Sequence, residues 1–190
     1  MGLFNRRPKL PSADRPPLAA DERVLAWAAA GTGEGGNDGV LVASNRGLWL
    51  PGRVDRLGWH DILKAVWSGR ELTVTPAEPV AERDGYLVVA DGLPETYLLV
   101  DPGDLPHQVR ARVTGSVAYT SHHEVPGGSG RIAARRVPGV DGLTWTVRYD
   151  PGTPTDDQAV TDETARLVAA ARAATTPPTP DTYTLRTSTS

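Results

Sequence analysis

The apolar residues of this chain occur in short runs separated by residues such as glycine, proline, asparagine and aspartate. The longest apolar run, residues 24–30, has seven residues. The sequence holds 20 glycines and 17 prolines, which are common in turns. Short apolar runs between turns are typical of β-strands, and none approaches the roughly 18–20 apolar residues of a membrane-spanning helix. The sequence therefore predicts a fold of many short elements, most of them strands.

The length of 190 residues predicts one domain with short additions. Residues 1–20 are expected to be a disordered basic leader, because several prolines interrupt them. They contain no apolar run that would make a secretory signal. Residues 175–190 are rich in threonine, proline and serine, so we expect a disordered tail there. The folded part is therefore expected within residues 21–174.

Turn residues divide the first half of the folded part into strands. Seven short strands are expected, at residues 22–28, 40–43, 48–50, 62–67, 71–75, 86–90 and 96–100. A helix is expected over 104–117, because Asp104 can cap it and Pro106 suits its first turn. Apolar residues recur along it every four positions, at Leu105, Val109, Val113 and Val117. Residues 21–117 are thus expected to form a small antiparallel barrel or sandwich closed by an amphipathic helix.

Strand patterns resume after this helix, at residues 118–125, 131–137 and 143–149. A second helix is expected from about residue 155 to 174, with Thr153 or Thr155 as its cap. We expect residues 118–174 to form a strand–strand–helix extension that packs on the barrel. The predicted fold class is therefore α+β and mainly β.

Tryptophan is expected to supply much of the large apolar volume of the core, since the chain has five Trp beside one Phe and one Met. All five lie in or beside expected strands, so we expect them to fill the core. They are Trp27, Trp49, Trp59, Trp67 and Trp145.

Two segments resemble the bacterial pleckstrin-homology-like (PH-like) family. Residues 40–50 (VLVASNRGLWL) resemble its strand, polar turn with arginine and second apolar strand. Residues 57–62 (LGWHDI) resemble its aromatic, polar and acidic step into the next strand. The resemblance covers about 22–117, and residues 118–174 look like an extension seen in actinobacterial proteins of this type. It implies a scaffold for binding and assembly, while fold alone does not fix a ligand.

Composition and motifs argue against most chemistries. The chain has no cysteine, which excludes disulfides, thiolate metal sites and cysteine nucleophiles. The formal charge of −3 argues against nucleic-acid binding. Gly31, Gly33 and Gly36 match a dinucleotide-binding pattern, but they lead into an expected strand where that site needs a helix. We therefore expect no cofactor, no metal and no catalytic residue.

Two groups of basic residues are candidate interaction sites. Arg131, Arg135 and Arg136 form the strongest local basic cluster, which suits a small anion or an acidic partner, or alternatively a solvated sheet face. Arg6, Arg7 and Lys9 lie in the leader, where weak contact with anionic lipid would contribute about 1 kcal/mol per residue near a charged surface.

These observations predict a cytoplasmic, non-enzymatic module that binds a protein or peptide partner. A partner strand could add to an open sheet edge, or a partner could occupy a groove beside the helix at 104–117. Two alternatives stay open. One is peripheral membrane association through the basic leader, and the other is an enzyme with a dispersed site around His60, His122 or Arg135. The oligomeric state and the biological process are left open.

Overall fold

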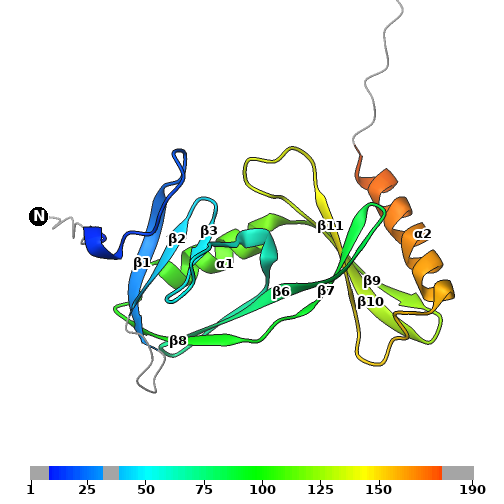
Figure 1. Cartoon of the computed structure of the whole chain (residues 1–190), viewed down its shortest axis with the longest axis horizontal. Coiled ribbons are helices and arrows are strands. Elements are labelled where there is room, and N and C mark those ends of the chain that lie inside the picture. The colour runs from blue at the N-terminus through cyan, green and yellow to red at the C-terminus, as the bar shows by residue number, and fades with distance from the viewer. Residues whose placement is uncertain (1–8, 32–38, 177–190) are drawn as a thin grey trace, which may run out of the picture.

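One long strand, β6 (Glu71–Arg83), runs through both halves of the molecule (Figure 1). The computed structural model describes residues 9–31 and 39–176. The first part of β6 pairs with β5 (Ile62–Ser68) and β8 (Glu95–Val100), and its second part pairs with β7 (Tyr86–Asp91). A shift in the pairing register lies between Pro79 and Ala81. The chain therefore has two lobes that share one strand.

The first lobe carries the strand order β4-β3-β2-β1-β8-β6, with β5 on β6. Its remaining elements are β1 (Val24–Gly31), β2 (Gly39–Ser44), β3 (Gly47–Trp49), β4 (Leu57–Gly58) and the helix α1 (Leu105–Ser116). A short 3-10 helix, η2 (Trp59–Asp61), joins β4 to β5. The helix packs across the strands through Leu105 and Val109, both fully buried. Leu41, Leu48 and Ile62 are among the fully buried residues around them.

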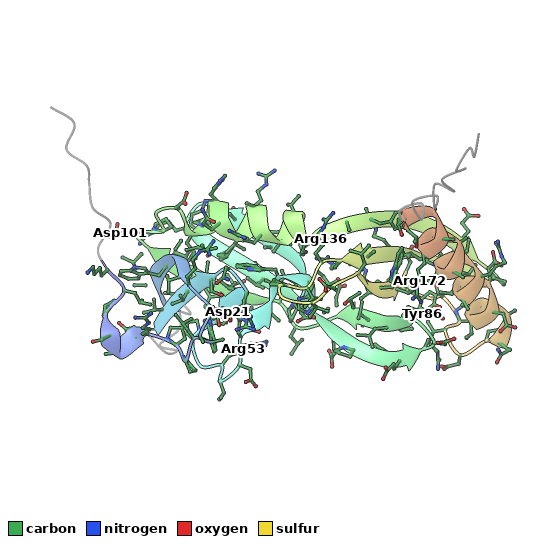
Figure 2. The ribbon with its side chains drawn as sticks, turned by 90° about the horizontal axis from the view of Figure 1, so that it is seen from above. Asp21, Arg53, Tyr86, Asp101, Arg136 and Arg172 are labelled. Carbon is green, nitrogen blue, oxygen red and sulfur yellow. The ribbon has the colours of Figure 1, made fainter. Side chains whose placement is uncertain are left out.

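The second lobe is formed by the end of β6, β7 and three later strands, in the order β6-β7-β11-β10-β9. These strands are β9 (Val117–Val125), β10 (Gly128–Arg135) and β11 (Thr144–Tyr149). β11 runs parallel to β7, and the other pairs are antiparallel. The helix α2 (Gln158–Thr175) covers this sheet, with Arg172 donating a hydrogen bond to the Gly85 carbonyl, 3.4 Å away, beside Tyr86 (Figure 2).

The mainly β, α+β class expected from the sequence is confirmed. Both expected helices and the three late strands lie where the apolar patterns predicted them. Two features differ. β6 continues beyond the expected 71–75 through two prolines, and β7, expected within the first unit, pairs with β11. The core of the second lobe accordingly includes Tyr86 and Val88. The boundary expected at residue 117 thus does not coincide with the boundary between the two cores, because apolar patterns do not specify pairing partners.

The helix caps differ from the expected ones. α2 begins after Asp157, whose side chain accepts a hydrogen bond from the Ala159 N–H at 2.8 Å, whereas a threonine cap at 153 or 155 was expected. Asp104 precedes α1 but makes no side-chain capping bond to it. Its carboxylate accepts a hydrogen bond from the Gln108 amide, at 2.9 Å. Both helices therefore begin within a turn of the expected position, with different local hydrogen bonds.

Three tryptophans fill the cores as expected. Trp49, Trp59 and Trp145 are buried, whereas Trp27 is half-buried on β1 and Trp67 is 38% exposed on β5. None of the helices in the described part of the chain is both long and apolar enough to span a membrane.

Most of the expected tail, the first part of the leader and the glycine-rich segment 32–38 lie outside the described residues. The rest of the leader contains a short 3-10 helix, η1 (Ser12–Asp14).

Candidate functional site: the open edge of β1

Among the described residues, one edge of β1 has a neighbouring strand along only part of its length. β1 pairs with β2 from Val24 to Ala30 but pairs with β8 only from Ala29 to Gly31. β8 ends at Val100, and the chain then turns toward α1. On the side away from β2, the described part of the chain therefore places no strand beside residues 24–28.

The turn that opens this edge depends on the residues after β8. Asp101 adopts a positive φ of 48°, and it is the sole non-glycine residue among those described that does so. Gly103 follows with a φ of 52°. Aspartate and glycine tolerate this region better than β-branched residues do. The sequence thus ends β8 at Val100 and directs the chain into α1, away from β1.

A groove of about 1040 Å³ lies along the open edge. We call it the β1 groove, and it is lined by Lys9, Leu10, Arg15, residues 22–29 and residues 100–104. Its apolar lining includes Leu10, Leu25 and Val100, the last of which is 49% exposed. Figure 2 shows η1 and Asp101 at the same end of the molecule, on opposite sides of it. Because residues 100–104 lead into α1, the groove borders both an open strand edge and the start of a helix.

The charges around the β1 groove are mixed. Lys9, Arg15 and Arg23 contribute cations, and Asp101 and Asp104 contribute carboxylates. Neither arginine has an ion-pair partner within the described part of the chain. The groove therefore does not concentrate positive charge as a phosphate-binding site does.

A buried carboxylate fixes the start of β1. The side chain of Glu22 is fully buried and accepts hydrogen bonds from Ser44 Oγ at 2.5 Å, Trp49 Nε1 at 3.0 Å and an Arg56 nitrogen at 2.6 Å. Burial raises the pKa of Glu22, but hydrogen bonds from Ser44, Trp49 and the Ala19 N–H, together with the charge of Arg56, outweigh it. The pKa therefore lies below its ordinary value, and the carboxylate stays charged. These hydrogen bonds thus hold the residues just before β1 in place at the groove.

A second cavity lies where the lobes meet, bordered by His60, Asp61 and Arg135. Arg135 is 7% exposed and donates a hydrogen bond to Ser116 Oγ at 3.0 Å. Burial lowers the pKa of Arg135, and the charge of Asp61 acts in the opposite direction. The buried atoms Arg135 Nε and His60 Nδ1 have no hydrogen-bond partner within the described residues.

This junction cavity is small. Its volume is about 40 Å³, and one water molecule occupies about 30 Å³ in the liquid. Substrate pockets have volumes of about 300–1,000 Å³. The cavity therefore has room for buried water, and it is too small for an organic substrate.

His122 lies apart from this cavity, in a polar cluster of the second lobe. Asp150 Oδ2 accepts a hydrogen bond from Ser129 Oγ at 2.6 Å and lies 3.2 Å from His122 Nε2. Hydrogen bonds from Ser129 and His122 lower the pKa of Asp150. In a Ser-His-Asp triad the histidine lies between the serine and the carboxylate, so that it can take the serine proton. Here the Asp150 carboxylate lies between Ser129 and His122, and the cluster connects β9, β10 and the residue after β11.

The expected basic cluster on β10 is not a single surface patch. Arg131 is exposed and donates to Thr120 Oγ1 at 3.4 Å, whereas Arg135 is buried. Arg136 donates to the carbonyls of Gly115 and Val117, at 3.4 and 3.5 Å, near the end of α1 (Figure 2). A cation at the C-terminal end of a helix interacts favourably with the helix dipole. The three arginines therefore have three different environments, because β10 passes from the open surface to the lobe junction.

The three basic residues of the leader also do not form one described cluster. Lys9 lines the β1 groove, while Arg6 and Arg7 lie outside the described residues. The described ranges contain no group of three or more histidines and carboxylates that could hold a metal ion. Sequence reasoning missed the β1 edge, and the one available signal was the turn sequence Asp101-Pro102-Gly103-Asp104 after the last strand of the lobe.

Comparison with models of known protein families, with curated proteins and with solved structures finds no match.

Proposed function

We propose that this protein is a non-enzymatic binding module that takes up a segment of a protein or peptide partner as an added strand on β1. The observation that carries the proposal is the β1 groove, which lies along β1 at the place where β8 ends. An extended peptide that adds to a sheet edge gains main-chain hydrogen bonds, and neighbouring side-chain pockets give selectivity.

The surroundings of the edge support strand addition there. The groove gives the partner's side chains apolar contacts with Leu25 and Val100. The hydrogen bonds to Glu22 hold the first residues of β1 against the turn between β2 and β3, so the edge is preorganised. Preorganisation reduces the ordering cost of binding. The groove also borders the start of α1, so strand addition and a helix-side groove would engage the same place.

The order of strands in the first lobe supports the further proposal that this lobe is PH-like. The order β4-β3-β2-β1-β8-β6, with β5 on β6 and α1 after β8, fits an antiparallel barrel closed by a helix. The hairpin formed by the end of β6 and β7 departs from that plan and extends into the second lobe. A PH-like lobe would serve as a scaffold, and the β1 edge would supply the specific contact.

Amide hydrogen exchange tests the proposed function. The probe is a blocked synthetic peptide of eight residues, Lys-Thr-Val-Thr-Val-Thr-Asp-Asp, added in excess to the full chain. We expect slower exchange at the amides of residues 24–28, because the bound peptide covers this edge of β1. The amides of β9, the strand at the far edge of the second lobe, serve as the internal control. Unchanged exchange at residues 24–28, with this peptide and with its sequence reversed, would contradict the proposal.

A further inference from the structure

A second groove lies along the later turns of α1, beside the segment that follows β10. Its volume is about 400 Å³, which falls within the range of about 300–1,000 Å³ that ligand pockets have. We call it the α1 groove, and it is lined by one face of α1, by Asn45 and Trp59, and by residues 136–138. It shares no lining residue with the β1 groove. The α1 groove is therefore a separate surface, which does not depend on strand addition at β1.

Hydrogen bonds hold the walls of the α1 groove in place. β10 ends at Arg135, and the backbone N–H of Arg136 then donates to the Ser116 carbonyl at 2.7 Å. This bond fixes the segment 136–138 against the last turn of α1 (Figure 2 labels Arg136). The side chain of Trp59 is 2% exposed, and its Nε1 donates to the Ser44 carbonyl at 3.1 Å. The groove is therefore preorganised, which reduces the ordering cost of binding.

The α1 groove concentrates positive charge. Arg112 lines it from α1, and Arg136 lines it from the segment after β10. Among the described residues, no aspartate or glutamate lines this groove, and neither arginine has an ion-pair partner. The chain as a whole has a formal charge of −3, so this is a local concentration. A concave surface lined by charges of one sign attracts a ligand of the opposite sign.

Both guanidinium groups have N–H donors that a ligand can use. Arg112 is half-buried and makes no hydrogen bond within the part of the chain that the structure describes. Arg136 is exposed, and its Nη1 donates to the carbonyls of Gly115 and Val117 at 3.4 and 3.5 Å. Its Nε and Nη2 take no part in these two bonds. A guanidinium has five N–H donors and binds carboxylates with two parallel hydrogen bonds.

Apolar side chains lie beside these charges. Ala111, Val137 and Pro138 line the same groove, and Ala111 is exposed. A small inorganic anion would use the guanidinium groups and leave this apolar surface in contact with water. A peptide that carries an apolar side chain next to its acidic ones would use both. The lining therefore favours a peptide over a free anion.

From this arrangement we infer that the α1 groove binds a protein segment in which acidic side chains adjoin an apolar one. The carboxylates accept hydrogen bonds from Arg112 and Arg136, and the apolar side chain contacts Val137 and Pro138. The inference goes beyond the proposed function, because it adds a second contact site with its own partner chemistry. Complementary charges at an interface fix its register and exclude wrong partners more than they add affinity.

Three peptides, blocked at their ends and fluorescently labelled, test the inference by anisotropy with the full chain. They are Ser-Gly-Asp-Glu-Leu-Gly-Ser, its amide counterpart Ser-Gly-Asn-Gln-Leu-Gly-Ser, and Ser-Gly-Asp-Glu-Ser-Gly-Ser. We expect the first to bind about fivefold more tightly than the amide counterpart in about 0.1 M salt, a difference that suits exposed charge pairs. The preference should shrink in about 0.5 M salt, where screening acts over roughly 4 Å. Loss of the leucine should weaken binding about threefold, because roughly 25 Å² of apolar surface then stays in water.

Variants assign the preference to the two arginines. Arg112→Glu should abolish the preference for the acidic peptide, and its Tm should be unchanged because the side chain makes no hydrogen bond in the described part of the chain. Arg110→Glu makes the same charge change at an exposed position of α1 that does not line the groove, so it should keep most of the preference. Arg136→Gln keeps a donor for the carbonyls at the helix end and should reduce the preference.

The outcomes also separate this inference from the proposed function. Equal affinities for the acidic and amide peptides would overturn it, and so would equal losses in Arg112→Glu and Arg110→Glu. Complete displacement of the acidic peptide by about 5 mM inorganic phosphate would show a general anion site and overturn the peptide assignment. Slower amide exchange at residues 24–28 with the acidic peptide would place that peptide on β1 and overturn the inference, while strand addition at β1 would stand.

Discussion

Ser44 donates a hydrogen bond of 2.5 Å to Glu22, which joins the end of β2 to the residue two positions before β1. Ser44 Oγ also accepts hydrogen bonds from the N–H groups of Arg46 and Gly47, each at 3.1 Å. The serine therefore connects the buried carboxylate to the turn between β2 and β3. This connection holds the start of β1 in place beside the groove.

Glu22→Gln should destabilise the fold. The amide keeps the size of the side chain but removes the charge that pairs with Arg56 and turns one acceptor oxygen into a donor. Breaking a buried pair on one side costs about 3 kcal/mol, and the partial exposure of Arg56 puts the expected loss nearer to about 2 kcal/mol. Urea denaturation would measure it. Asp21→Asn, at an exposed ion pair with Arg46, is the matched control with an expected change below about 1 kcal/mol, and an equal effect of the two variants would contradict the prediction.

The same carboxylate predicts a dependence of stability on acid. The pKa of Glu22 is lower in the folded chain than its ordinary value of 4.5, so the unfolded chain binds the proton more tightly. Its contribution to stability is complete above pH 4.5 and is lost as the pH falls through the folded pKa. Thermal unfolding between pH 6 and pH 3 should therefore show a smaller loss of Tm in Glu22→Gln than in the unaltered chain. Parallel curves for the two proteins would refute this.

The open edge of β1 shows where sequence reasoning stopped. Because burial imposes a period on each element, the apolar runs predicted both helices and most of the strands, but not β4 or the second half of β6. They did not predict that β8 would leave β1 after Val100, because a pattern along one strand does not specify its neighbour or the length of their pairing. The Asp-Pro-Gly sequence that begins at Asp101 was the local signal for this departure, and Asp101 adopts a positive φ there.

The basic cluster shows a second limit. Arg135 was expected with Arg131 on one face of a surface strand, and the pairing of β10 with β11 runs without interruption between them. Arg135 is nevertheless buried, because the first lobe covers that end of β10 through Ser116 and His60. Such burial depends on how two lobes meet, and residues far apart in the sequence determine it.

Arg135→Met should leave stability unchanged or raise it by about 1 kcal/mol. The guanidinium is buried with an unpartnered Nε and no ion pair within 4 Å among the described residues. Replacing a buried charge with an apolar side chain of similar volume is often neutral or stabilising. Urea denaturation of the variant would measure the change. Arg131→Met, at an exposed position of the same strand, is the control, and a loss above about 2 kcal/mol for Arg135→Met alone would contradict the prediction.

His123 should make the second lobe less stable in mild acid. It is 8% exposed, neither ring nitrogen has a hydrogen-bond partner in the described residues, and its ring lies edge-on to Tyr149 at 6.4 Å. Burial lowers the pKa of His123 below 6.5, and the charge of His122 acts in the same direction. The unfolded chain therefore binds the proton first, and stability falls as the pH drops below 6.5 toward the folded pKa.

His123→Phe keeps an aromatic ring at this position and removes the titrating group, so its Tm should change less between pH 7 and pH 5 than that of the unaltered chain. His107→Phe changes an exposed histidine of α1 and should leave the pH dependence as it is. An unaltered slope in His123→Phe would show that another group carries the effect.

The apolar lining of the β1 groove predicts that Val100 contributes to peptide binding. Its side chain is 49% exposed, so Val100→Asn should change stability by less than about 1 kcal/mol, as surface substitutions usually do. Bound peptide would cover the valine and bury apolar surface at about 25 cal/mol per Å². Burial of roughly 40 Å² would therefore make the affinity about fivefold lower in the variant. Val66→Asn, at a 40% exposed valine of β5 outside the groove, is the matched control and should bind as the unaltered chain does. Fluorescence anisotropy with the blocked peptides measures both, and equal affinities for the two variants would place the apolar contact elsewhere.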